Sequence, residues 1–221
     1  MPEHHAYLRG VIAPTPADRP STAIGDRRDL RRWIVAVSIG EGVGFAIAAG
    51  VAVLTIVAAV PDPARFALII GGGAVEGAAL AIGQYLGMRQ RRPRIIAWIV
   101  ATAVAAAFAW ALGMLPSTLG LDLAAPAVIA MVVGGGVALL AVIPVAQWLV
   151  LARPGAFRWV PVSVGAWAVA ILWTFAPSPF IDEHSSLTLV VILYVLAGAL
   201  MAVTFALLTA GTAHRLFGST A

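Results

Sequence analysis

The 221-residue chain contains no cysteine, and all fourteen of its basic residues are arginines. The absence of cysteine excludes disulfides, thiolate metal sites and cysteine catalysis. Charged residues make up only 11% of the chain, whereas hydrophobic residues make up 61% and the mean hydropathy is +0.96. So apolar a composition cannot be arranged around one soluble core of this size, which indicates an integral membrane protein.

Motifs of common enzyme classes are also absent. The chain has no HExxH, no GxSxG, no P-loop and no acid-rich metal-phosphate motif, and its apolar runs hold no nucleophile paired with a base. We therefore predict no enzymatic activity and no cofactor, with an intramembrane carboxylate enzyme acting on lipid or isoprenoid as the alternative. Asp182, Glu183 and His184 are adjacent, but adjacent loop residues rarely converge on one ion, so we expect a solvated loop there and no metal.

The hydrophobic residues are concentrated in six long runs. Each run is long enough to cross about 30 Å of hydrocarbon as a helix, and the alternating pattern of barrel strands is absent. Short segments rich in Pro, Gly or Arg separate the runs, so neighbouring helices are expected to form antiparallel hairpins. We predict an all-α integral membrane domain over residues 33–213, with six transmembrane helices at about 33–60, 66–88, 95–115, 124–152, 159–176 and 187–213.

The positions of the arginines predict the orientation of these helices. Thirteen of the fourteen lie before the first run, in the second and fourth connections or after the sixth run, whereas Arg65 lies on the opposite side. Basic residues near the ends of spans are retained in the cytoplasm. Both termini are therefore predicted to be cytoplasmic: residues 1–32 as a flexible Arg- and Pro-rich tail with a short juxtamembrane helix over 26–32, and residues 214–221 as a short C-terminal tail.

The isoelectric point near 10.6 follows from this arrangement of arginines. It does not require a nucleic-acid partner, because topology already accounts for the positive charge. We predict that the arginine-rich face contacts anionic lipid of a bacterial cytoplasmic (inner) membrane, which the protein crosses several times.

An offset of 63 residues relates two of the runs. The glycine triplet at 71–73 matches the triplet at 134–136, and Gln84 matches Gln147. A further step of 63 residues reaches Ala197-Gly198-Ala199 in the sixth run. Three tandem helical hairpins in one orientation explain this offset, giving parallel pseudo-repeats rather than the inverted repeats common in secondary transporters.

A Gln-aromatic-Leu-x-Leu-x-Arg motif over residues 147–153 ends the fourth run, and Arg158-Trp159 opens the fifth. With this motif the chain resembles a loose group of bacterial multi-span membrane proteins that have repeated Gly-rich, Gln-aromatic-Leu helical hairpins. The resemblance covers about residues 33–215. It implies no particular activity, so no functional residue is carried over from it.

Two acidic residues, Glu41 and Glu76, lie deep inside predicted helices. A charge in hydrocarbon is costly, so each is a functional candidate by default. Counting outward from a turn centred at residue 63 places Glu41 and Gln84 at similar depth on the cytoplasmic side, with Gln147 joining them through the repeat. At 1.5 Å per residue, Glu76 is expected about 13 Å from Glu41 along the axis, near the midplane, so the two carboxyl groups are not expected to share a proton.

Each polar residue also has a structural interpretation. A buried Glu can be protonated and bonded to a neighbouring helix, and a buried Gln can simply join two helices. Tryptophans near the ends of spans are expected to act as interfacial anchors. Small residues four positions apart let helices approach closely, and such pairs are Gly40 with Gly44, Gly73 with Gly77 and Gly83 with Gly87.

Two functions from different classes fit these observations. In the first, the protein handles a small solute or ion, with Glu41, Gln84 and Gln147 lining a cytoplasmic-side polar pocket and Glu76 as a deeper titratable group. In the second, it is a non-catalytic structural or assembly subunit that binds another membrane protein or anionic lipid. A water-accessible cavity that reaches Glu41 or Glu76 would favour the first function, and a dry helix interface would favour the second.

Overall fold

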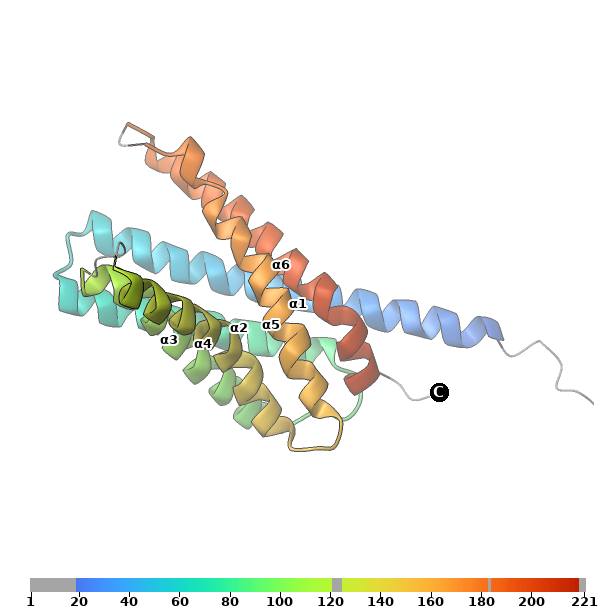
Figure 1. Cartoon of the computed structure of the whole chain (residues 1–221). Coiled ribbons are helices and arrows are strands. Elements are labelled where there is room, and N and C mark those ends of the chain that lie inside the picture. Colours follow the sequence, from blue (N-terminus) through green and yellow to red (C-terminus); the bar gives the residue numbers. More distant parts are fainter. Residues whose placement is uncertain (1–18, 121–124, 183, 219–221) are drawn as a thin grey trace, which may run out of the picture.

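The computed structural model describes residues 19–120, 125–182 and 184–218. Within these residues the protein is all-helical and contains no β-strand. Six helical segments are long and apolar enough to cross a membrane, which confirms the predicted class. Figure 1 shows the main helices: α1 (Arg19–Val57), α2 (Asp62–Gly87), α3 (Ile95–Thr118), α4 (Pro126–Leu151), α5 (Trp159–Ala170) and α6 (Leu187–Phe217).

The fifth segment is less regular than expected. The α-helix α5 ends at Ala170, and three short 3-10 helices flank it: η2 (Ala156–Arg158), η3 (Ile171–Phe175) and η4 (Ser178–Phe180). Together they form a membrane-spanning candidate from Ala156 to Phe180. This candidate therefore matches the predicted span at 159–176 in position, but only its first half is α-helical.

The first helix is longer at its start than predicted. The predicted juxtamembrane helix over 26–32 is part of α1, which begins at Arg19 and continues without a break into the first span. Pro20 stands in the first turn, where its missing N–H costs no helical hydrogen bond. The juxtamembrane part is also held by other elements, because Asp29 is buried and pairs with Arg89 at 3.0 Å. The rest of the predicted tail, residues 1–18, lies outside the described residues.

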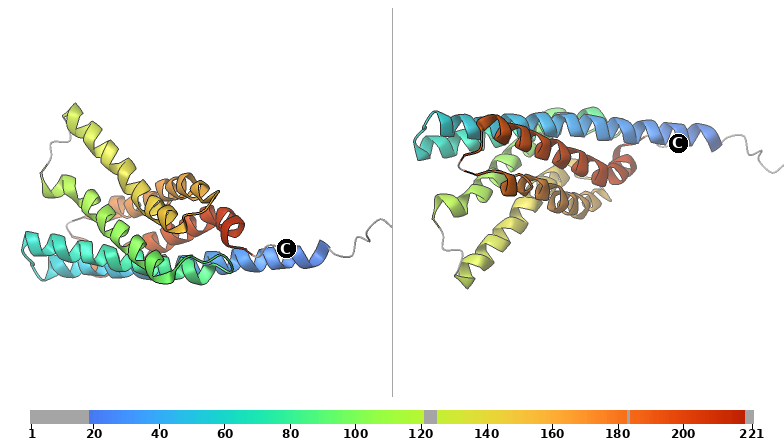
Figure 2. Two further views of the ribbon diagram at one scale, coloured as in Figure 1. Left: turned by 90° about the horizontal axis from the view of Figure 1, so that it is seen from below. Right: turned by 90° about the horizontal axis from the view of Figure 1, so that it is seen from above.

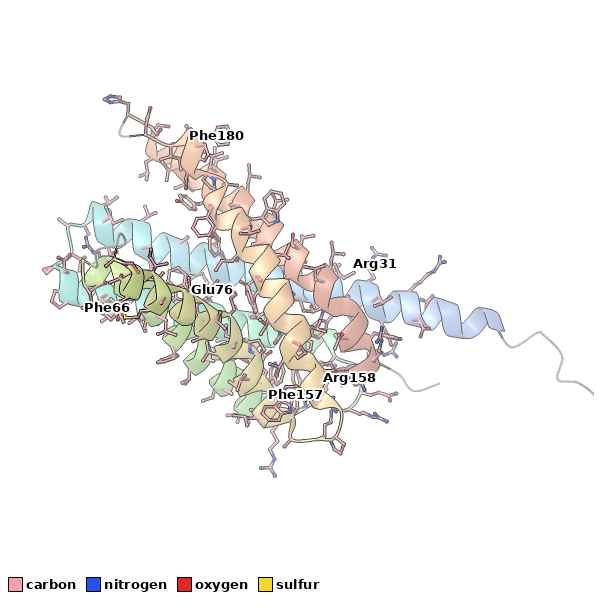
Figure 3. All side chains as sticks on the ribbon, viewed as in Figure 1. Arg31, Phe66, Glu76, Phe157, Arg158 and Phe180 are labelled. Carbon is pink, nitrogen blue, oxygen red and sulfur yellow. The ribbon has the colours of Figure 1, made fainter. Side chains whose placement is uncertain are left out.

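The helices pack in the order of the sequence. Each contacts the next along the chain, and α6 returns against α1, so the six form a ring. Figure 2 shows that α4 leans away from α1 and α2 at the end that carries the α3–α4 turn, while the helices come together at the opposite end. In Figure 3, Arg31 and Arg158 lie toward the converging end, Phe66 and Phe180 toward the diverging end, and Glu76 between them. We refer below to the arginine end and the diverging end.

An aromatic cluster closes the arginine end. Trp33 stacks on Phe217 with ring centroids 6.1 Å apart, and Trp98 and Trp159 meet the same phenylalanine edge-on. All four side chains are buried. These three tryptophans lie near the ends of spans, as the sequence indicated, but their side chains are buried around Phe217 and are not exposed on the surface of the bundle.

Candidate functional site

Glycines bring α1 and α2 into backbone contact, as the small-xxx-small spacing predicts. A Cβ atom at Gly40 would lie 2.6 Å from the carbonyl oxygen of Ala79, and one at Gly44 would lie 2.9 Å from the Cα atom of Glu76. Real Cβ atoms do not come so close to backbone atoms. These contacts fix the register of the two helices, with Gly44 beside Glu76.

This register places Glu41 and Glu76 closer together than predicted. Because Gly44 lies beside Glu76, Glu41 is three residues from the level of Glu76, or about 4.5 Å along the axis. The expected separation of about 13 Å was wrong because α2 begins at Asp62, so Pro63 belongs to the helix and not to the turn. The two carboxyl groups interact with each other.

The side chain of Glu41 is fully buried, and its setting is unusual for a carboxyl group. Neither carboxyl oxygen has a hydrogen-bond donor in good geometry among the described residues. Leaving a buried polar group without a donor costs about 1–3 kcal/mol, and more if the group is charged. The polar group that Glu41 meets is the carboxyl group of Glu76, so the pair keeps a capacity to bind a positive charge.

Glu76 differs from Glu41 because it has a donor. The indole N–H of Trp110 on α3 donates to its Oε2 atom over 2.5 Å. The ring of Trp110 lies against Gly73, where a Cβ atom would come within 2.1 Å of the Cδ1 atom of the ring. Gly73 thus makes room for the tryptophan that positions Glu76.

A cavity of about 880 Å³ reaches both carboxyl groups. It extends from Glu41 and Glu76 along the inner faces of the helices toward the diverging end, as far as Ile56 and Leu187. Its wall is mostly aliphatic. The aromatic side chains in the wall are Phe45, Trp110, Trp167 and Tyr194, and none of the described residues that line it is basic.

Gln84 and Gln147 lie together, but they do not line this cavity. The Nε2 atom of Gln147 donates to Gln84 Oε1 at 2.7 Å and to Thr102 Oγ1 at 3.1 Å, and its Oε1 atom accepts from Trp159 Nε1 at 2.8 Å. Both glutamines are buried. The predicted pocket of Glu41, Gln84 and Gln147 therefore divides in two: a packed polar network on the arginine side, and a carboxyl pair at the floor of the cavity.

Asp182 lies in the loop that was considered above for metal binding, and it bonds within that loop. The Oδ1 atom of Asp182 accepts hydrogen bonds from Ser185 Oγ at 2.8 Å and from the His184 N–H at 3.0 Å. These donors, chiefly Ser185, hold the pKa of Asp182 below its usual value. No group of three potential metal-ligating side chains comes together anywhere in the described residues; Glu183 is not among them.

Sequence reasoning missed Trp110 as a site residue. It lies near the end of a predicted span, where a tryptophan is normally an interfacial anchor. The sequence feature that could have indicated a large residue beside Glu76 lies on the neighbouring helix, because Gly73 and Gly77 on either side of Glu76 leave space for a large side chain. A buried indole N–H also needs an acceptor, and Glu76 is a deep one.

Comparisons with protein-family models, with curated proteins and with solved structures found no match to this chain.

Proposed function

We propose that the protein handles a small solute or ion in a bilayer, and that the cavity above Glu41 and Glu76 is its binding site. The observation that carries this proposal is a fully buried carboxyl group that meets a second carboxyl group at the floor of an 880 Å³ cavity, with no basic residue among the described lining residues. A group that serves only to join helices is expected to be bonded and dry. Intramembrane acids that face a cavity are typical of ligand and ion pathways.

The orientation is part of this proposal. We infer that both termini are cytoplasmic, in a bacterial inner membrane, because the arginines gather at one end of the bundle. In this orientation the cavity opens on the outer side, and the aromatic cluster with the glutamine network forms the cytoplasmic closure. The arginine end then faces anionic lipid.

We also infer three tandem hairpins as parallel pseudo-repeats. The hydrogen bond between Gln84 and Gln147 supports this interpretation, since it joins two side chains that the 63-residue offset makes equivalent. If the three hairpins share an orientation, equivalent residues on α2 and α4 lie at one depth. Such a pair is well placed to meet across the bundle.

A second candidate is a structural or assembly subunit. It is favoured by the triplet Gly134, Gly135 and Gly136 on α4, where an added Cβ atom would meet no other described atom within 4 Å. Bare glycines on a membrane helix leave space for a partner helix. Co-purification from native membrane tests this candidate, because a stable partner would stay with the wild-type protein and be lost from a Gly135→Leu variant.

Flux measurements in proteoliposomes test the first candidate. Purified full-length protein is reconstituted with a pH-sensitive dye inside, and movement of protons, Na⁺, K⁺ and a panel of labelled amines and sugars is recorded in imposed gradients. Wild-type protein should move at least one of these species faster than empty liposomes do. Glu76→Gln should abolish or uncouple that flux, because the amide cannot carry the charge.

Asp182→Asn is the matched control, since it removes a carboxylate from an exposed loop residue that does not line the cavity. It should leave the flux unchanged. If folded wild-type protein moves none of the tested species, the solute-handling function fails and the assembly function is preferred.

A further inference from the structure

We propose that the ligand of this cavity is a hydrophobic organic cation, whose positive group binds at Glu41 and Glu76 and whose apolar body lies against the wall. This inference rests on the proposed function and specifies its substrate class. It follows from three features of the cavity: its charge, its shortage of oxygen ligands, and its wall.

The charge of the cavity is one-sided. Two carboxyl groups interact at its floor, and none of the described lining residues is basic. An anionic ligand would be repelled by this pair when either carboxyl is ionised. A neutral apolar ligand would leave an ionised carboxyl group of this pair without a counter-charge, whereas a cation would neutralise it.

A bare metal ion fits the site poorly. Mg²⁺ and Ca²⁺ require about six to eight oxygen ligands. Besides Glu41 and Glu76, the lining residues with side-chain oxygens are Thr174 on η3 and Tyr194 on α6, so α1 and α2 add no further side-chain oxygen to the lining. Trp110 offers an N–H donor, which repels cations instead of binding them. A polyol would likewise find few hydrogen-bonding partners along the aliphatic wall.

The wall suits the apolar body of an organic cation. The cavity volume of about 880 Å³ lies within the range of roughly 300–1,000 Å³ found for small-molecule sites. Trp110, Trp167 and Tyr194 line it, and aromatic faces attract desolvated cations as well as apolar groups. Burial of the ligand body then supplies affinity, and the carboxyl pair supplies selectivity for charge.

Equilibrium dialysis with tetraphenylphosphonium tests this inference on the purified full-length protein in detergent. Tetraphenylphosphonium is a permanent cation, and tetraphenylborate has nearly the same size and shape but the opposite charge. Wild-type protein should bind the cation saturably at about one per chain and should show no saturable binding of the anion. Glu41→Gln should weaken binding of the cation by at least tenfold, and Glu41→Gln combined with Glu76→Gln should abolish it.

Two further variants keep the test decisive. Asp182→Asn removes an acid outside the cavity and should bind as wild type does. Gly50→Trp adds volume at a cavity-lining position where a Cβ atom meets no atom within 4 Å, so it should block binding of the cation while both carboxyl groups remain. If the glutamine variants fail to fold, the Gly50→Trp result decides whether the cation binds in the cavity.

The inference is overturned if the anion competes equally well, or if the folded double variant still binds the cation with wild-type affinity. Its failure can be distinguished from failure of the proposed function. Flux that depends on Glu76 without any binding of tetraphenylphosphonium would overturn the substrate class alone. Absence of both flux and binding would overturn both proposals.

Discussion

Trp110 on α3 donates its indole N–H to the carboxyl group of Glu76 on α2. Among the described residues, this indole is the donor that the Glu41–Glu76 pair receives from outside the pair. The contact joins two helices at the floor of the cavity. It also distinguishes the two acids, since Trp110 bonds Glu76, whereas the polar group that Glu41 meets is Glu76 itself.

Trp110→Phe should destabilise the protein by about 1–3 kcal/mol, because the aromatic ring is kept while Glu76 loses its donor. Unfolding by a titration of SDS into detergent-purified protein measures the change. Trp173→Phe is the matched control: Trp173 donates to Thr204 at 3.0 Å in an exposed position, so its loss should be below about 1 kcal/mol. Equal losses for the two variants would contradict the importance given to the Trp110 contact.

Gly73→Ala should destabilise by about 1–3 kcal/mol, because its Cβ atom would overlap the ring of Trp110 and the pair must move apart. Gly71→Ala on the same helix meets no atom within 4 Å and should be neutral or stabilising by up to about 1 kcal/mol, as alanine favours helix. The same unfolding titration compares the two. A stable Gly73→Ala protein with an unchanged tryptophan fluorescence spectrum would show that the packing around Trp110 is loose.

Gln147→Leu should cost more stability than Gln84→Leu. The first change leaves the N–H of Trp159 and the Oε1 atom of Gln84 without partners, for a loss of about 1–3 kcal/mol. After the second change, Gln147 still donates to Thr102 and accepts from Trp159. A double-mutant cycle should give a coupling of about 0.5 kcal/mol or more between the two glutamines. Additive losses would contradict a direct bond between them.

Binding of tetraphenylphosphonium should weaken as the pH falls. The charge of this probe is constant, so a proton that binds Glu41 or Glu76 removes the attraction, and affinity drops by up to about tenfold per pH unit for each proton displaced. The titratable side chains that line the cavity are Glu41, Glu76 and Tyr194. Tyr194→Phe should leave the pH dependence of the affinity unchanged. Glu41→Gln combined with Glu76→Gln should abolish binding of the cation and therefore its pH dependence. Affinity that rises on acidification would contradict competition between proton and cation.

Cysteine labelling tests the orientation, because the natural chain has no cysteine to remove. Ala64→Cys lies at the diverging end and Gln90→Cys follows α2 at the arginine end, and both positions are exposed. In intact cells a membrane-impermeant maleimide should label Ala64→Cys but should label Gln90→Cys only after permeabilisation. The reverse pattern would place the cavity mouth on the cytoplasmic side.

The class of the protein and the positions of its helices were predictable because hydropathy and turn residues are local properties. The observed helices end within a few residues of the predicted runs, except where α1 extends back to Arg19. Asp29 in that extension pairs with Arg89, a contact between residues far apart in the sequence. No local pattern indicates such a contact.

The candidate site was predictable in its residues but not in its arrangement. The cost of burying acids indicated Glu41 and Glu76 as candidates, and the 63-residue offset indicated that Gln84 and Gln147 are equivalent. The depths of Glu41 and Glu76 were misjudged because Asp62 and Pro63 were assigned to the turn, which moved the centre of the turn by about three residues. The axial separation of residues on the two facing helices then changes by twice that number. The cavity itself depends on how far α4 diverges from α1, which sequence does not specify.

The aromatic cluster at the arginine end has a consequence for how the protein is made. Trp33 near the start of the first span bonds Thr209, which lies 176 positions later, and stacks on Phe217 at the end of α6. Partners so distant along the chain meet only after the last helix has been synthesised. Until then the first five helices stand in the bilayer as an open arc in which Trp33 lacks both of its partners on α6, whereas the glutamine network can already form because its members lie on α2 to α5.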